Sequence, residues 1–511
     1  MYRVLTGCHR RARGLRQWGN VSTTSPGRTA PSRPIPSGSY PALDRFFHIT
    51  ERGSTLAREL RGGVVTFFTM SYILVLNPLI LGGAFAGDGD VTSAKAKIAA
   101  GTALIAGVMT ILMGVVANYP LAMAAGLGIN AMVAYTIVGN HGMTFADAMG
   151  IVVIEGVIIL VLVLTGFREA VFRAVPPFLR TAISVGIGLF IALIGLVDAK
   201  VVRAGGTPLE LGLGGSLKGW PVIVFLVGLF LTIILHIRKV RGAILIGIIS
   251  ATLLAVIIEA VESLGAFDKD ANPTGWALSV PSLSGSPISM PDLSGLGHFS
   301  LLGSFEKAGA VSIVLLVFSM MLADFFDTMG TMVAIGAEGD LLDDNGNPPR
   351  TREILVVDSV GAIAGGLGAV SSNTSYVESA AGVGEGARTG LANVVTGALF
   401  LASVFLSPIV AMVPYEAATP ALVVVGFLMM TQVADIDWKR PELGIPAFMT
   451  IIMMPFSYSI TNGIGAGFLT YVLVEIAVGR ARRVHPLMWL TAALFAVYFT
   501  MAPIKEILGL A

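Results

Sequence analysis

Two acids and two threonines recur at helical spacing in the middle of the largely apolar stretch 319–340. They are Asp324, Asp327, Thr328 and Thr331. Positions i, i+3, i+4 and i+7 share one face of a helix. Two carboxylates one turn apart in a medium of low dielectric constant cannot easily both ionise, so this pair could bind and release a proton. The alternative is a polar stripe whose groups are satisfied by neighbouring helices.

A second candidate is a run of hydroxyl and amide side chains within 369–390, which includes Ser372, Asn373 and Thr374. These residue types favour helix N-caps, so we expect a helix that begins here, within the membrane, after an extended stretch. Such a half-helix presents free N–H groups and a positive dipole end to a ligand. We expect Glu378 one turn into that helix, where it could contact a ligand directly.

A third candidate is 118–135, where Pro120, Gly126 and Gly128 interrupt an apolar segment. Extended backbone at membrane depth is tolerated only where it is buried in protein or lines a cavity. Asn130 follows the interruption, in the position that a ligand-facing amide would take. The alternative is a packing helix kinked at its glycines.

Glu155 lies alone in the apolar stretch 151–166. A charged side chain at the centre of a bilayer costs roughly 2.5–3.5 kcal/mol on insertion scales, so an acid there is a functional candidate. The sequence leaves two roles open, a structural brace and a supporting part of the site.

The elements that position these residues must be membrane helices. The chain has 511 residues, 54% hydrophobic and 13% charged, whereas soluble domains carry about 25% charged residues. More than ten apolar runs approach the roughly 20 residues needed to cross a bilayer, for example 220–235 and 243–258. A net charge of +1 suggests no nucleic-acid partner. The lone Cys8 and the scattered histidines suggest no metal site, and we expect no cofactor.

The chain divides into a tail at 1–45, predicted to be disordered, and a membrane transport domain at 46–505. Lys and Arg in alternate short loops place the N-terminus in the cytoplasm. The stretches Pro176–Ala199 and Pro414–Ile436 are similar and should have opposite orientations, which favours inverted repeats at about 60–262 and 309–505. Chance similarity between apolar segments is the alternative.

Four stretches of the sequence together resemble one family. They are RELRGGVVTFFTMSYILVLNPLIL, AGLGINAMVAY, ADFFDTMGT and NTSYVESAAGVGEGARTG. They look like signature stretches of the AzgA-like purine permeases, the hypoxanthine–adenine–guanine branch of the nucleobase–cation symporters. The resemblance implies an all-α fold of about 14 transmembrane segments in two inverted seven-segment repeats, with core and gate domains and half-helices in segments 3 and 10. Hydropathy alone gives fifteen segments.

The resemblance also implies a function, the proton-coupled import of adenine, guanine or hypoxanthine across the cell membrane, and a homodimer as the expected assembly. By motif it assigns substrate contacts to Asn130, Asp324 and Glu378, with Asp327 as the second acid of its segment. We expect Ser372, Asn373 and Thr374 to line the substrate site. Proton coupling is expected at Asp324, Asp327 and Glu378, supported by Thr328, Thr331 and Glu155.

Several alternatives remain open at this stage. Another nucleobase, such as uracil or xanthine, or coupling to Na⁺ would suit the same fold. A channel or an anion exchanger should carry basic residues at the half-helix ends, where this chain carries acids. A membrane enzyme would need a nucleophile–base pair or a metal cluster, and no His, Cys and carboxylate grouping suggests one, so we expect no enzyme activity.

Overall fold

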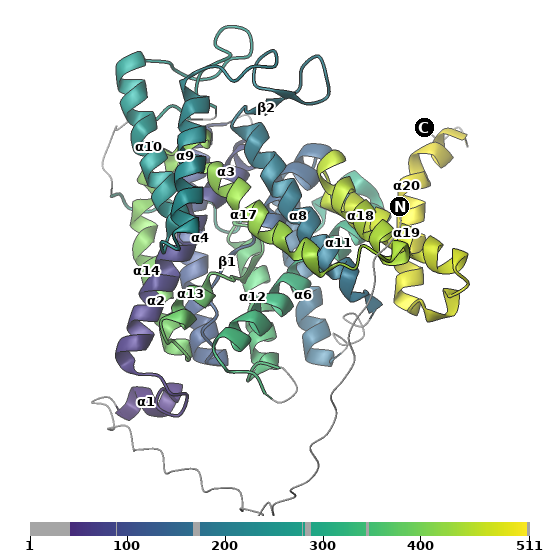
Figure 1. Ribbon diagram of the computed structural model, residues 1–511, viewed down its shortest axis with the longest axis horizontal. Coiled ribbons are helices and arrows are strands. Elements are labelled where there is room, and N and C mark those ends of the chain that lie inside the picture. Colours follow the sequence, from purple (N-terminus) through teal and green to yellow (C-terminus); the bar gives the residue numbers. More distant parts are fainter. Residues whose placement is uncertain are drawn as a thin grey trace, which may run out of the picture.

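The computed structural model describes residues 41–87, 89–166, 174–277, 279–281, 288–343 and 347–507, and these residues are mostly helical (Figure 1). Within them, ten helices are long and apolar enough to cross a membrane, and three more are apolar but shorter. The predicted polytopic helical membrane protein is therefore confirmed. The described residues give ten such helices and three shorter ones, so the count of about 14 segments stays a prediction.

One bundle of helices surrounds a short pair of strands near the middle of the molecule (Figure 1). Its elements are α2 (Leu56–Met70), α3 (Ile73–Ala86), α4 (Val91–Leu112), η1 (Met113–Ala117), β1 (Met123–Ala125), α5 (Leu127–Ala131), η2 (Met132–Asn140), α6 (Phe145–Thr165), α11 (Gly303–Glu338), α12 (Thr351–Leu367), β4 (Asn373–Ser375), α13 (Ser379–Gly384), α14 (Gly390–Ser403), η3 (Val404–Leu406) and α15 (Ser407–Ala411). We call it the strand-bearing bundle.

The other helices pack mainly on one another and form a second bundle. Its elements are α8 (Pro177–Asp198), α9 (Trp220–Ile237), α10 (Ala243–Glu262), α16 (Tyr415–Ala418), α17 (Pro420–Met430), η4 (Thr431–Asp435), α18 (Pro441–Phe456), α19 (Ile460–Ala477), η5 (Ala481–Arg483) and α20 (Pro486–Ile507). The strands β2 (Val202–Arg203) and β3 (Glu210–Leu211) pair in the connection between α8 and α9.

The two similar stretches noted in the sequence form neighbouring helices of the second bundle. Helices α8 and α17 pack along each other and approach most closely at Gly188 and Gly426. A Cβ atom on Gly188 would lie 2.8 Å from the Gly426 carbonyl oxygen, and one on Gly426 would lie 2.4 Å from the Gly188 carbonyl oxygen. Small residues allow helices to approach this closely within a membrane. Gly188 and Gly426 therefore permit the close contact between α8 and α17.

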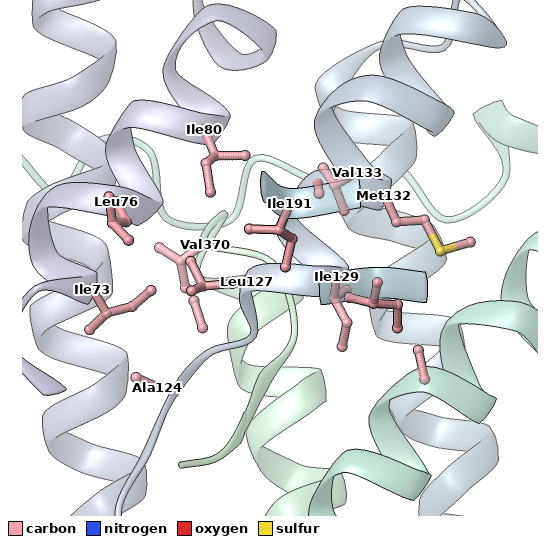
Figure 2. Close-up of a cluster of buried hydrophobic side chains, with 14 of the residues drawn as sticks. Ile73, Leu76, Ile80, Ala124, Leu127, Ile129, Met132, Val133, Ile191 and Val370 are labelled. Carbon is pink, nitrogen blue, oxygen red and sulfur yellow. The ribbon is translucent and has the colours of Figure 1, made fainter. Parts of the chain in front are cut away.

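The two bundles meet through an apolar cluster (Figure 2). Leu127 and Ile129 of α5 lie in one cluster with Ile191 of α8, and Ile73 and Leu76 of α3 belong to the same cluster. All five side chains are buried. The contact between α5 and α8 therefore joins the element that carries Asn130 to the second bundle.

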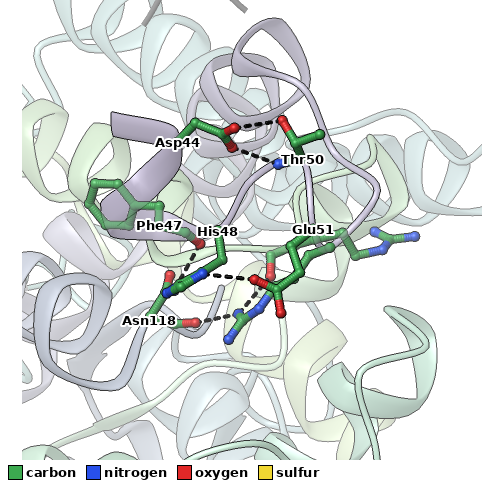
Figure 3. Close-up of polar contacts among 8 residues, drawn as sticks. Asp44, Phe47, His48, Thr50, Glu51 and Asn118 are labelled. Atoms are coloured by element: carbon green, nitrogen blue, oxygen red, sulfur yellow. Dashed lines mark hydrogen bonds and ion pairs between the residues drawn. The ribbon is translucent and has the colours of Figure 1, made fainter. Parts of the chain in front are cut away.

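The N-terminal end of the described chain departs from the prediction. Residues 41–45, which we assigned to a disordered tail, belong to helix α1 (Pro41–Phe47); residues 1–40 lie outside the described residues. The Asp44 carboxylate accepts bonds from the backbone N–H (2.7 Å) and hydroxyl (2.8 Å) of Thr50, and Asn118 Nδ2 donates to the Phe47 carbonyl oxygen at 2.8 Å (Figure 3). The Thr50 bonds hold the pKa of Asp44 below its ordinary value. Polar contacts thus attach α1 to the bundle, which the low-complexity sequence before it did not indicate.

Candidate functional site

Two chain segments become extended at the centre of the strand-bearing bundle. Strands β1 and β4 pair antiparallel, with Ala124 opposite Thr374. The ladder continues beyond the strands, because Gly126 N donates to the Ser372 carbonyl oxygen and Tyr376 N donates to the Ala122 carbonyl oxygen, both at 2.9 Å. Each strand supplies the backbone partners that water cannot supply at this depth. The predicted extended stretches in both segments are therefore present, and they bond to each other.

A short helix follows each strand, and the one after β4 begins later than predicted. Helix α13 starts at Ser379 with Glu378 at its N-cap, so Glu378 lies at the end of the helix and not one turn inside it. The hydroxyl-rich run does not cap the helix as expected. Its side chains instead bond to acids of α11 and α12, which draws residues 373–375 into the strand.

Helix α5 follows β1 directly and carries Asn130 on a buried face. Gly128 permits this placement, because a Cβ atom there would lie 2.7 Å from Ile187 Cγ2 of α8. Asn130 is fully buried, and neither its Oδ1 nor its Nδ2 bonds to another group of the described residues. Burying an unpaired amide is costly, so Asn130 is a good candidate to bond a ligand.

A chain of hydrogen bonds links the strands to the acid of α11. Ser372 Oγ donates to Asp324 Oδ2 at 2.9 Å, and Thr374 is among the groups that interact with the Asp324 carboxylate. The hydroxyls of Thr374 and Thr328 lie 2.8 Å apart and share a hydrogen bond. The sequence-predicted residues Asp324, Thr328, Ser372 and Thr374 are therefore brought together in one network.

The network continues to Asp358 on α12. Thr328 Oγ1 donates to Asp358 Oδ1 at 2.8 Å, and Ser375 Oγ donates to the same oxygen at 3.0 Å. Asp358 is buried. We did not predict a role for Asp358 from the sequence. Like Glu155, however, it is an acid inside an apolar stretch, and that feature could have identified it.

Asp327 and Glu378 lie on the accessible side of this network. The Asp327 side chain is exposed and the Glu378 side chain is partly exposed, and both carboxylates belong to one electrostatic cluster with Asp324. The hydroxyl of buried Tyr72 on the α2–α3 span donates to Glu378 Oε1. We noted no role for Tyr72 from sequence, because nothing distinguishes it there from a packing aromatic residue. The described residues therefore leave part of both acids uncovered, and one of the two is oriented by a tyrosine.

The other predicted residues occupy varied positions. Glu155 is fully buried on α6 and its carboxyl faces that of Asp324. Asn373 lies in β4 with its Nδ2 unpaired among the described residues. Thr331 is buried one turn beyond Thr328. Within the described chain, no Lys, Arg or His is among the charged groups that face Glu155, Asp324, Asp327 or Glu378.

Comparison with known proteins places this architecture in a class. Residues 57–465 match the model of the Permease family, and the chain belongs to that family. It is a membrane transporter and not an enzyme.

The curated relatives match most of the chain. The chain is 36% identical over 465 residues to the guanine/hypoxanthine permease PbuG of Bacillus subtilis, a match that covers 89% of this chain and 99% of that protein. It is 37% identical over 454 residues to the adenine permease AdeP of Escherichia coli, with 89% and 95% covered. It is 35% identical over 416 residues to the nucleobase transporter PlAzg2 of Paenibacillus larvae, with 81% and 77% covered.

Solved structures share the fold at low sequence identity. The transmembrane domain of the cyanobacterial bicarbonate transporter BicA aligns with a TM-score of 0.53 and 16% identity, covering 83% of this chain and 97% of that domain. The murine anion transporter Slc26a9 in its inward-facing state aligns with a TM-score of 0.54 and 11% identity, covering 88% of this chain and 73% of that protein. These likenesses concern the fold alone.

Proposed function

We propose that this protein imports purine nucleobases, namely adenine, guanine or hypoxanthine, together with protons. The relatives that match nearly its whole length are named as purine-base permeases. The observation that carries the proposal is the site itself, where accessible acids adjoin the paired strands and Asn130.

The site offers groups that complement a purine edge. The Glu378 carboxylate, held by the Tyr72 hydroxyl, accepts hydrogen bonds and suits the N–H groups of a base. The Asn130 amide supplies one acceptor and two donors, which suits the mixed edge of a purine ring. A base that leaves these polar groups unpaired would bind much more weakly, so the same contacts select for purines.

Protons couple to the base through the acids of α11. In this proposal Asp324 binds a proton from outside, which lowers the negative charge of the site and strengthens binding of the base. It releases the proton inside, while Asp327 and Glu378 adjust the charge that the site presents. Coupling of this kind is reciprocal: if a bound proton increases the affinity for the base, the bound base increases the affinity for the proton by the same factor.

The acids also separate this proposal from the anion transport carried out by the structural neighbours. An anion site needs positive charge or a concentration of N–H groups. Here five carboxylates cluster, and no basic side chain of the described residues faces them. A neutral base with N–H donors suits such a site better than bicarbonate does, and fold does not fix the substrate.

Transport on this fold requires motion of one bundle against the other. We propose that the strand-bearing bundle is the core domain, which carries the base, and that the second bundle is the gate domain. The gate would supply the contact of a homodimer in the cell membrane, with the N-terminus in the cytoplasm. The repeats at about 60–262 and 309–505 would then be the two inverted halves, each contributing a segment with a strand and a half-helix.

Uptake of labelled adenine by cells that express the protein, measured at several pH values and against a panel of unlabelled bases, tests the proposal. We expect competition by guanine and hypoxanthine but not by uracil, and uptake that rises as the outside becomes more acidic. Uptake that is indifferent to purine competitors would refute the substrate class. Uptake that survives collapse of the proton gradient would refute proton coupling.

A further inference from the structure

Two carboxyl groups face each other between α6 and α11, behind the accessible part of the site. Glu155 is 0% exposed and Asp324 is 1% exposed, they lie on helices that pack against each other, and their carboxyl groups are among each other's interacting groups. Glu155 Oε1, Glu155 Oε2 and Asp324 Oδ1 are buried, and no N–H or O–H group of the described residues bonds to them. Among the four carboxyl oxygens of the pair, Asp324 Oδ2 is the one that accepts a hydrogen bond from the described residues, from Ser372 Oγ at 2.9 Å.

The chemistry of these oxygens calls for a proton between them. An ionised carboxylate only accepts hydrogen bonds, so two carboxylates cannot satisfy each other. One added proton converts the contact into an O–H···O⁻ bond, which belongs to the strong class of charge-assisted hydrogen bonds. The other ionisable groups that face the pair are Asp358 and Asp327, both acids, and within the described chain no basic side chain offsets them.

We propose that Glu155 and Asp324 hold the coupling proton jointly, as one site that alternates between no proton and one proton. The inference rests on the proposed proton-coupled import and makes it more specific. Binding takes a proton from water and changes the charge of the pair from −2 to −1; release returns the proton to water. Glu155 does not contact the base in this scheme. It acts through Asp324, because the shared proton fixes which oxygens of Asp324 can accept further hydrogen bonds.

The substitution Glu155→Gln tests this directly. A glutamine amide donates to Asp324 Oδ1 permanently and so imitates the protonated pair without a titratable proton. In proteoliposomes with a clamped membrane potential, we expect the variant to exchange labelled adenine for unlabelled adenine at a rate nearly independent of pH. It should not accumulate adenine along a pH gradient, whereas one-to-one symport by the unmodified protein should accumulate about tenfold per pH unit.

A matched control is the same change at another buried acid. Glu416 on α16 is also 0% exposed, but it accepts a bond from Ala277 N at 2.9 Å and its charged neighbours include Lys200 and Arg203. Glu416→Gln should keep gradient-driven accumulation. If Glu155→Gln also keeps it, with unchanged pH dependence, Glu155 is only a structural brace and the inference is wrong. If the unmodified protein shows no gradient-driven accumulation, proton coupling itself fails.

Infrared spectroscopy covers the case in which Glu155→Gln does not fold. The unmodified protein should show the carbonyl stretch of a buried protonated carboxyl group, sensitive to exchange into D₂O. In Glu155→Asp, which keeps the acid on a shorter side chain, this band should shift. A band that is present but identical in Glu155→Asp would contradict the shared site, because the proton would then reside elsewhere.

Discussion

Removing the hydroxyl of Tyr72 should weaken purine binding by an amount that the structure lets us estimate. Tyr72→Phe deletes the donor to Glu378 and leaves the buried ring in place. A hydrogen bond to a charged group is worth about 1.5–3 kcal/mol. If purine N–H groups bind the oriented carboxylate, the loss corresponds to roughly a 10- to 150-fold rise in KM, since about 1.4 kcal/mol is a factor of ten.

Adenine exchange in proteoliposomes at fixed pH measures this KM without any driving force. Tyr119→Phe is the matched control, because its buried hydroxyl also donates one hydrogen bond, at 2.7 Å to the Met332 carbonyl oxygen, but does not contact Glu378. We expect the control to keep the KM of the unmodified protein. An unchanged KM in Tyr72→Phe, with the protein correctly folded, would refute the assignment of Glu378 as a substrate ligand positioned by Tyr72.

Three further predictions follow from single contacts. Gly128→Ala should lower uptake severalfold by pushing α5 away from α8, and Ile187→Ala in the same chain should restore much of it, which uptake assays of the single and double variants can check. Thr328→Val keeps the side-chain shape but removes a donor from the buried network, so uptake should fall at least tenfold while the protein remains in the membrane. Because the fold lowers the pKa of Asp44, its contribution to stability is present at neutral pH and lost as pH falls through that lowered value. The protection factor of the Thr50 amide, which corrects for the intrinsic pH dependence of exchange, should therefore fall only in acid, and this pH dependence should be absent in Asp44→Asn.

Much of the fold was predictable because the membrane imposes simple rules. Long apolar runs identified the spanning helices, and the proline and glycines of 118–135 identified a segment that could not be one continuous helix. The pairing of β1 with β4 was beyond reach, since it joins residues about 250 positions apart and no local pattern encodes register.

The site was predictable where the signal was a polar group among apolar neighbours. That signal marked Asp324, Glu155 and Asn130, all of which are buried near one another or beside the strand pair. The same signal did not identify Tyr72, because a tyrosine in a membrane helix cannot be distinguished from a packing aromatic residue until the hydrogen-bond partner of its hydroxyl is known. The start of α13 was misplaced because serine and threonine can either cap a helix or bond to distant acids, and tertiary contacts decide between the two.

The charge movement that follows addition of a purine is the sharpest test of whether the base enters together with a proton. A neutral base that enters with a proton carries positive charge across the membrane. Proteoliposomes adsorbed on a sensor should therefore give a transient current when adenine is added in Na⁺-free buffer, and the current should decline as the pH is raised and the proton becomes scarce. The account predicts this current for purines and not for uracil. No current, or a current that appears only when Na⁺ is added, would contradict it.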